Sequence, residues 1–94
     1  MTYEGILSML KVDLQISTPR MDEYLRDLIW SAQSLITTEG INLDLCNQED
    51  CMLTEMYAAY LYRKRREDTT GMPRMLRWAL NNRLFSQKAR QTDG

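Results

Sequence analysis

The residue types that most often carry out chemistry in proteins are sparse in this chain. It contains no histidine, and Cys46 and Cys51 are its only cysteines. A structural zinc site needs four nitrogen or sulfur ligands, so these two thiols cannot supply one within a single chain. Two states remain open for the pair. One is a disulfide across the short spacing, and the other is two separate and partly buried thiols, which is more common in an intracellular protein.

Paired carboxylates are the other groups that could do acid–base work. Asp22 with Glu23, and Glu49 with Asp50, lie at expected helix starts, where a favourable interaction with the helix dipole explains them. The sequence also lacks a nucleophile elbow, a glycine-rich phosphate loop and a cysteine–histidine pair. We therefore expect a binding or assembly protein and not an enzyme, and no zinc site within the chain.

Basic residues gather toward the C-terminal end of the chain. The segment 60–66, YLYRKRR, ends in four consecutive cations, and a helix dipole favours positive charge in the last turn of a helix. Residues 1–62 hold three Lys or Arg against ten Asp or Glu, a net charge of −7, whereas residues 63–94 hold nine against three, a net charge of +6. This asymmetry predicts either a nucleic-acid or membrane surface at the basic end, or subunits that meet acidic end to basic end.

Length and composition indicate one small soluble domain over residues 1–94. The chain is 44% apolar and 27% charged, and its mean hydropathy is −0.49. It has no apolar run long enough to span a membrane. Glu4 precedes the first apolar residues and no basic segment leads into them, so we expect the protein to work in the compartment where it is made.

Helical periodicity predicts an all-α fold, a small bundle of about four helices, and no strand pattern appears. The four expected helices run from Tyr3 to Val12, from Pro19 to about Glu39, from Asn47 to Arg66, and onward from Pro73. The expected N-caps are Thr2, Thr18 and Asn47, and Gly40 suits a helix C-terminus. The polar segment from about residue 86, SQKARQTDG, is expected to be a flexible tail.

Apolar residues at three- and four-residue spacing predict the buried stripes. In the second helix these are Met21, Leu25, Leu28, Ile29, Ala32, Leu35 and Ile36. The third helix supplies Leu53, Met56, Tyr57 and Tyr60, and the fourth supplies Met72, Met75, Leu76, Ala79, Leu80 and Leu84.

Several large side chains do not fit these stripes. Trp30 and Tyr62 point away from the stripes of their helices, and Trp78 and Phe85, seven residues apart, flank the polar side of the fourth helix. These aromatic residues either pack against loops and the first helix or mark an interface. Arg83 instead falls inside the apolar stripe. Two explanations remain open for it, a side chain that extends to the edge of the bundle and an ion pair between subunits.

The polar side of the fourth helix raises the alternative of a DNA-binding module. Arg74, Arg77, Asn81 and Lys88 share one side of that helix, as residues of a recognition helix in a major groove would. A pI of about 5.3 and the acidic first two thirds of the chain argue against this alternative, because they would repel the duplex.

Three segments in order carry a family resemblance: PRMDEYLRDLIWSAQSLITTEGI, then YAAYLYRKRR, then MPRMLRWALNNRLFSQK. Together they resemble the small head-to-tail connector proteins of long-tailed bacteriophages, the adaptor or head-completion family often labelled DNA-packaging proteins. The resemblance covers about residues 6 to 88, and its most specific pieces are YAAYLYRKR and MPRMLRWALNNRL.

The resemblance implies a helical adaptor that forms a ring, twelvefold in the mature virion, below the portal protein. Such an adaptor joins the portal to a tail-side stopper or tail-completion protein and lines the channel through which DNA passes without sequence-specific binding. It implies a place in the neck of the virion, and in the host cytoplasm before assembly, with no membrane, cofactor or catalysis. A ring requires one surface of a subunit to meet a different surface of its neighbour, and the acidic and basic parts of this chain would be complementary. The residues expected at the subunit or portal interface are Trp30, Tyr62, Arg63, Arg65, Arg66, Arg74, Arg77, Trp78, Arg83 and Phe85.

Overall fold

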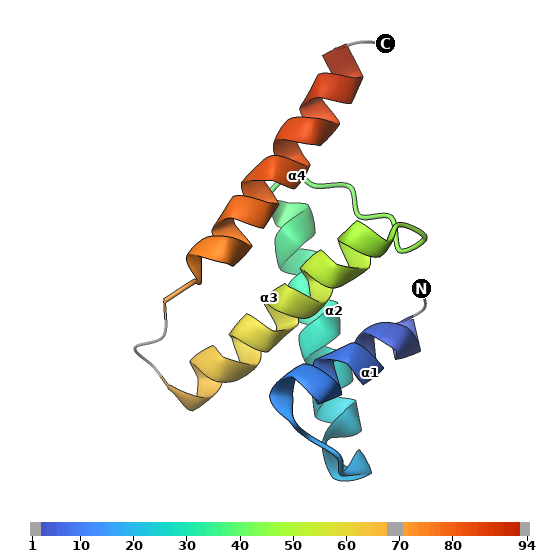
Figure 1. Ribbon diagram of the computed structural model, residues 1–94, viewed down its shortest axis with the longest axis vertical. Coiled ribbons are helices and arrows are strands. Elements are labelled where there is room, and N and C mark those ends of the chain that lie inside the picture. The colour runs from blue at the N-terminus through green and yellow to red at the C-terminus, as the bar shows by residue number, and fades with distance from the viewer. Residues whose placement is uncertain (1–2, 68–70, 93–94) are drawn as a thin grey trace.

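The protein is a four-helix all-α structure, as the sequence predicts. The computed structural model describes residues 3–67 and 71–92, and it contains no strand within these ranges. The helices are α1 (Tyr3–Leu14), α2 (Asp22–Thr38), α3 (Gln48–Arg66) and α4 (Arg74–Thr92), and a short 3-10 helix, η1 (Pro19–Met21), leads into α2 (Figure 1). No helix within the described ranges has both the length and the apolar character needed to cross a lipid bilayer.

Local signals set most helix ends. The Thr18 hydroxyl accepts a hydrogen bond from the backbone N–H of Arg20 at 3.2 Å, and the Asn47 side chain accepts one from the N–H of Glu49 at 2.8 Å. Gly40 has φ of +100°, a conformation that glycine adopts without strain, directly after α2. The predictions for Asn47 and Gly40 are confirmed. Thr18 caps the 3-10 helix η1 and not α2 itself, whose first residue follows Met21 without a side-chain cap. The proposed cap at Thr2 lies outside the described residues.

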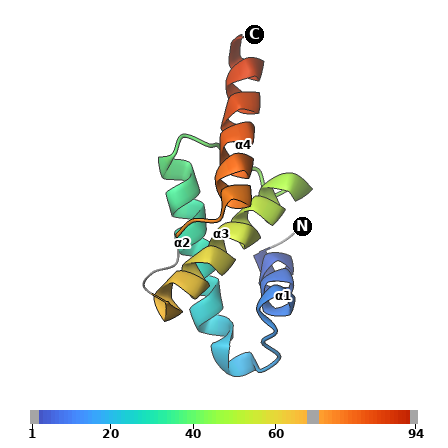
Figure 2. The same cartoon turned by 60° about the vertical axis from the view of Figure 1, so that its left-hand side comes forward.

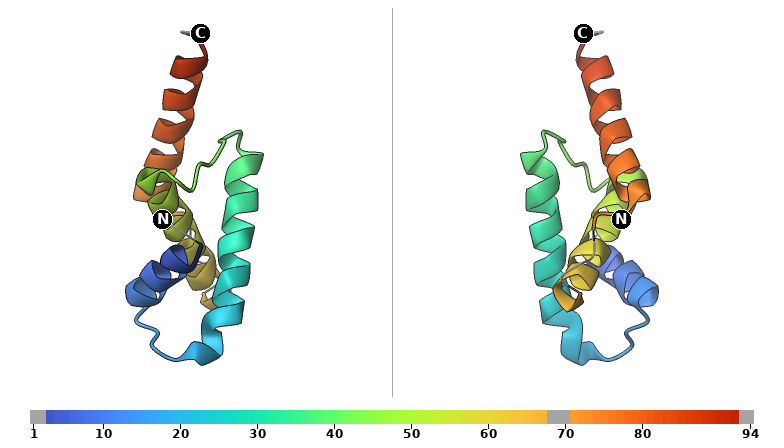
Figure 3. Two further views of the ribbon diagram at one scale, coloured as in Figure 1. Left: turned by 90° about the vertical axis from the view of Figure 1, so that its right-hand side faces the viewer. Right: turned by 90° about the vertical axis from the view of Figure 1, so that its left-hand side faces the viewer.

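The core is built mainly by α1, α2 and α3. The most extensive packing is between α2 and α3, and α1 packs on both of them. α4 adds Leu76 and Leu80, each 1% exposed, and then extends beyond the rest of the bundle (Figures 1 and 2). α1 lies near one end of the molecule and the C-terminal half of α4 projects from the other (Figure 3). One side of α4 therefore stays uncovered over most of its length.

Two predicted core residues are exposed. Leu35 is 41% exposed and Met75 is 68% exposed, so their assignment to the buried stripes was wrong. Each lies at the edge of its stripe. Met75 is exposed because α4 touches the bundle along one narrow side, and Leu35 faces the shallow pocket that it borders with Trp30 and Leu61. The other predicted stripe residues are buried or half-buried.

Residues 86–92, in the segment expected to form a flexible tail, continue α4 as a helix. Gln87 ties this part of the helix to the connection between α2 and α3. Its amide donates to the carbonyl of Gly40 at 2.8 Å, and its side-chain oxygen accepts from the N–H of Asn42 at 2.8 Å. A polar side chain thus attaches the helix to this connection one turn beyond Leu84, which packs against the core. Residues 93–94 lie outside the described part of the chain.

Candidate protein interaction surfaces

The basic run at the end of α3 makes contacts within the chain at every position. Arg63 lies 3.6 Å from a carboxylate oxygen of Asp13. The next three cations each lie 5.7 Å from the centre of a tyrosine ring: Lys64 over Tyr60, Arg65 over Tyr24 and Arg66 over Tyr62. All four side chains remain exposed, so the run covers the aromatic edge of the core while its charge stays accessible to solvent.

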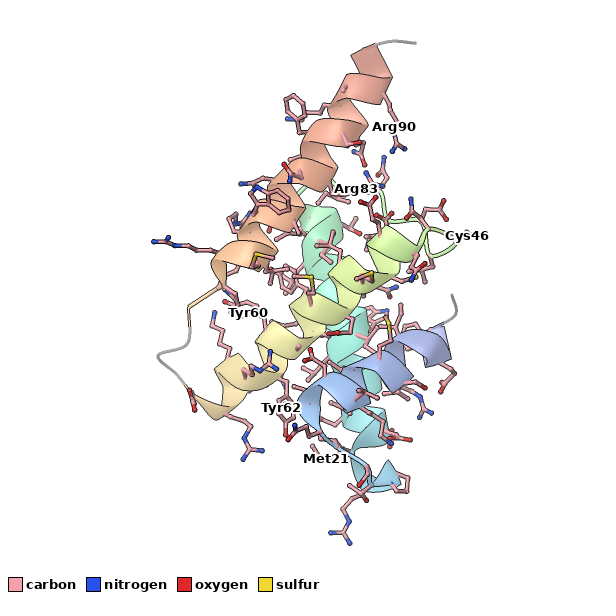
Figure 4. The ribbon with its side chains drawn as sticks, viewed as in Figure 1. Met21, Cys46, Tyr60, Tyr62, Arg83 and Arg90 are labelled. Atoms are coloured by element: carbon pink, nitrogen blue, oxygen red, sulfur yellow. The ribbon has the colours of Figure 1, made fainter. Side chains whose placement is uncertain are left out.

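Tyr62 belongs to this aromatic edge and is half-buried. Its ring packs against Tyr24 of α2 with centroids 6.4 Å apart, and its hydroxyl accepts a hydrogen bond from Arg66 at 3.0 Å. Figure 4 places Tyr62 on the C-terminal half of α3. Tyr62 therefore has a structural role within the chain that its position on the helical wheel did not predict.

Arg77 attaches α4 to the end of α2. It forms two hydrogen bonds with the carboxylate of Glu39, at 2.8 and 3.3 Å. The pair is partly open to solvent, since the two side chains are 46% and 28% exposed. Most of the charge of Arg77 is thus compensated within the subunit.

Arg83 forms a buried ion pair with Asp50 of α3. Its Nε lies 2.6 Å from Asp50 Oδ1, and its Nη2 donates to Asp50 Oδ2 at 3.1 Å and to the carbonyl of Asn42 at 2.8 Å. The two side chains are only 15% and 1% exposed. Hydrogen bonding to Asp50 raises the pKa of Arg83, so the guanidinium remains charged.

This geometry replaces both explanations offered for Arg83. Its head group reaches a carboxylate inside the same chain, not the edge of the bundle and not a neighbouring subunit (Figure 4). It also corrects the assignment of Asp50 to dipole capping alone, because Asp50 is buried and accepts from the backbone N–H of Asp44 at 2.8 Å as well as from Arg83. The wheel identified Arg83 as unusual, but its partner lies 33 residues away in the sequence.

The side of α4 opposite the bundle carries the most exposed large apolar residues of this helix. Met75, Trp78 and Phe85 are 68%, 64% and 76% exposed. We call the outward residues of this helix the α4 outer face: Arg74, Met75, Trp78, Asn81, Asn82, Phe85 and Ala89, all of which are exposed. The predictions that Trp78 and Phe85 face away from the core are confirmed, and Met75 joins them.

A groove of about 420 Å³ runs between α3 and α4 beside this face. Met52, Leu53 and Met56 of α3 line one wall, and the other wall is formed by α4 residues that include Trp78, Ala79 and Arg83. Met52 is itself 49% exposed. The apolar surface of α4 therefore continues onto the N-terminal half of α3.

Another exposed aromatic residue lies on a different element. Trp30 of α2 is 65% exposed and borders a shallow pocket together with Leu35, Leu61 and Arg65. We call the outward residues of this helix the α2 outer face: Glu23, Asp27, Trp30, Ser34 and Thr37, all of which are exposed. The structure thus brings Trp30 and Arg65 together, while Trp78, Phe85 and Arg74 share another surface.

An acidic pair joins α1 to α3. Burial, the nearby charge of Asp13 and a hydrogen bond with Asp13 together raise the pKa of Glu55 to about 7, and the positive charge of Arg63 opposes the rise. Glu55 Oε2 is buried without a hydrogen-bond partner in the described part of the chain. Sequence reasoning missed this pair because Asp13 and Glu55 lie on helices that are distant in sequence.

The two cysteines are not joined by a disulfide. Cys46 is exposed, whereas Cys51 is buried and its thiol donates to the carbonyl of Leu45 at 3.2 Å. Residues 3–67 and 71–92 contain no group of three or more His, Cys, Asp or Glu side chains arranged to hold a metal ion.

No model of a protein family, no curated protein and no solved structure matches this chain. Only the residues of this chain therefore bear on its function.

Proposed function

We propose that this protein is a non-enzymatic adaptor of the head-to-tail connector of a long-tailed bacteriophage. It would form a ring below the portal protein in the virion neck, twelvefold in the virion, and join the portal to a tail-side stopper or tail-completion protein. DNA would pass through the ring without sequence-specific binding. The resemblance of three sequence segments to this family supplies the class of protein.

The observation that carries the proposal is the exposed apolar character of the α4 outer face. An aromatic side chain presents about 150–250 Å² of surface, so Met75, Trp78 and Phe85 together leave on the order of 400 Å² of apolar surface open to water. A patch of this size is typical of a protein interaction site. Large exposed aromatic residues are also the side chains that contribute most to protein–protein binding.

The DNA-binding alternative has less support from the geometry. A recognition helix offers cations and amides to base edges and phosphates, but Arg77 and Arg83 are engaged by Glu39 and Asp50. The exposed side of α4 instead presents Trp78 and Phe85 beside Arg74 and two asparagines, Asn81 and Asn82.

The test is size-exclusion chromatography with light scattering, with and without the portal protein of the same phage. We expect a ring, or a stable complex with the portal, and at most weak retention by duplex DNA. A monomer that ignores the portal and binds duplex DNA with a steep loss of affinity at high salt would overturn the proposal in favour of the DNA-binding alternative.

Trp78→Ala and Phe85→Ala should weaken assembly. Val12→Ala is the matched control, because Val12 is 79% exposed on α1 and its truncation also removes exposed apolar surface. Equal loss of assembly in the control and in the two α4 variants would contradict a specific role for the α4 outer face.

A further inference from the structure

The α4 outer face has the spacing of a helix-packing seam. Met75, Trp78, Asn82, Phe85 and Ala89 follow one another at steps of three, four, three and four residues. This is the spacing at which one helix presents a continuous stripe to another helix, and a single polar residue such as Asn82 within the stripe selects one register. All five residues are exposed, so within the subunit this seam has no helix packed on it.

The α2 outer face has the same spacing and the opposite charge. Glu23, Asp27, Trp30, Ser34 and Thr37 follow one another at steps of four, three, four and three residues. Glu23 and Asp27 form no ion pair within the described part of the chain, and the same is true of Arg74 on the α4 outer face. Each face therefore combines an exposed tryptophan with unpaired charge, acidic on α2 and basic on α4.

We propose that the α4 outer face of one subunit packs lengthwise on the α2 outer face of a second copy of this chain. Arg74 then meets the carboxylates of Glu23 and Asp27, and Trp78 packs beside Trp30. This inference rests on the proposed function, since it names which two surfaces meet in the assembly. The contact joins two different surfaces, so it leaves a free α2 face on one subunit and a free α4 face on the other, as a ring requires.

The available surface agrees with such a contact. The α4 seam exposes on the order of 400 Å² of apolar side chain, and its polar neighbours Arg74, Asn81 and Asn82 widen it toward the roughly 800 Å² per partner that specific interfaces bury. Two α4 faces packed on each other would leave Arg74 without a carboxylate from the partner, because Arg74 is the only charged residue of the α4 outer face. The acidic α2 face supplies that carboxylate.

The test is site-directed cross-linking of the full chain. In a Cys46→Ser background, which removes the exposed native thiol, Ser34→Cys is introduced on the α2 outer face and Asn82→Cys on the α4 outer face. A short bismaleimide should join a mixture of the two single variants into dimers, and the double variant into a ladder of dimers and larger species. Each single variant alone should stay uncross-linked. Ser8→Cys on α1, which is also exposed, paired with Asn82→Cys, is the matched control and should give no ladder.

Three outcomes would overturn the inference, and they separate it from the proposed function. Cross-linking of a single variant with itself would show a contact between like faces. An assembly seen by light scattering without the Ser34–Asn82 cross-link would refute the α2–α4 contact and leave the adaptor function standing. No assembly with or without the portal would refute the adaptor function, and the inference with it.

Discussion

Replacement of Arg83 by methionine would remove one half of a buried ion pair and leave the other half in place. Asp50 would keep its hydrogen bond from the N–H of Asp44, but its carboxylate, 1% exposed, would have no compensating charge. Breaking a buried pair in this way costs about 3–5 kcal/mol. Because Arg83 is 15% exposed, we expect a loss near the lower end, about 3 kcal/mol at pH 7. That is a large part of the ~5–15 kcal/mol typical of a small domain.

Urea unfolding followed by circular dichroism at pH 7 measures this loss as the difference in unfolding free energy between the variant and the unchanged protein.

Arg77→Met is the matched control, because Arg77 lies on the same helix as Arg83 but pairs with Glu39, at the end of α2, in a site partly open to solvent. It should cost about 0–1 kcal/mol. The double variant Arg83→Met with Asp50→Asn should recover part of the loss, since the amide oxygen keeps the contact with the Asp44 N–H without the buried charge. A cost for Arg83→Met within 1 kcal/mol of the control would refute this account of how α4 is held.

Three further predictions address other parts of the molecule. Glu55→Gln should stabilise the protein at pH 8. The pKa of Glu55 is about 7 in the folded protein against an ordinary 4.5, so ionisation of this side chain lowers the free energy of unfolding as pH rises between these values, by at most ~3.4 kcal/mol and by about 1–2 kcal/mol for a half-buried side chain. Unfolding curves at pH 5 should therefore show no more than about a quarter of the stabilisation measured at pH 8. Arg74→Glu should reduce assembly measured by light scattering, and Asp27→Lys in the same chain should restore it; failure of the second change to restore assembly would contradict the pairing of these two faces. Gln87→Ala should loosen the C-terminal half of α4, because it removes the hydrogen bonds to Gly40 and Asn42. Backbone hydrogen exchange should become faster at residues 84–90 and change little around Leu76. Unchanged exchange at residues 84–90 would show that these hydrogen bonds do not hold this segment.

The sequence predicted the helices well because their signals are local. Thr18, Asn47 and Gly40 act within a few residues of their own positions, so their types and spacing are enough to place three helix ends. The buried stripes follow from helical periodicity for the same reason, and the misfits Trp30, Trp78 and Phe85 were read correctly as facing away from the core.

Interactions between distant residues were beyond sequence reasoning. A helical wheel shows Arg83 as a charged residue on the apolar side of its helix, but nothing in the local sequence pattern points to Asp50 as its partner. Gln87 likewise looks like part of a polar tail in the sequence, and only the structure shows its hydrogen bond to the α2–α3 connection. Met75 was misplaced because the wheel cannot tell how much of α4 the bundle covers. The exposed seam on α4 exists because that coverage is narrow.

Electron microscopy of the protein mixed with the portal of the same phage would test the adaptor function most directly. The account predicts a ring of density below the portal for the unchanged protein and for Val12→Ala, and loss of that ring for the combined Trp78→Ala and Phe85→Ala variant. A bare portal with the unchanged protein present in excess, or a ring that survives the loss of both aromatic residues, would contradict it.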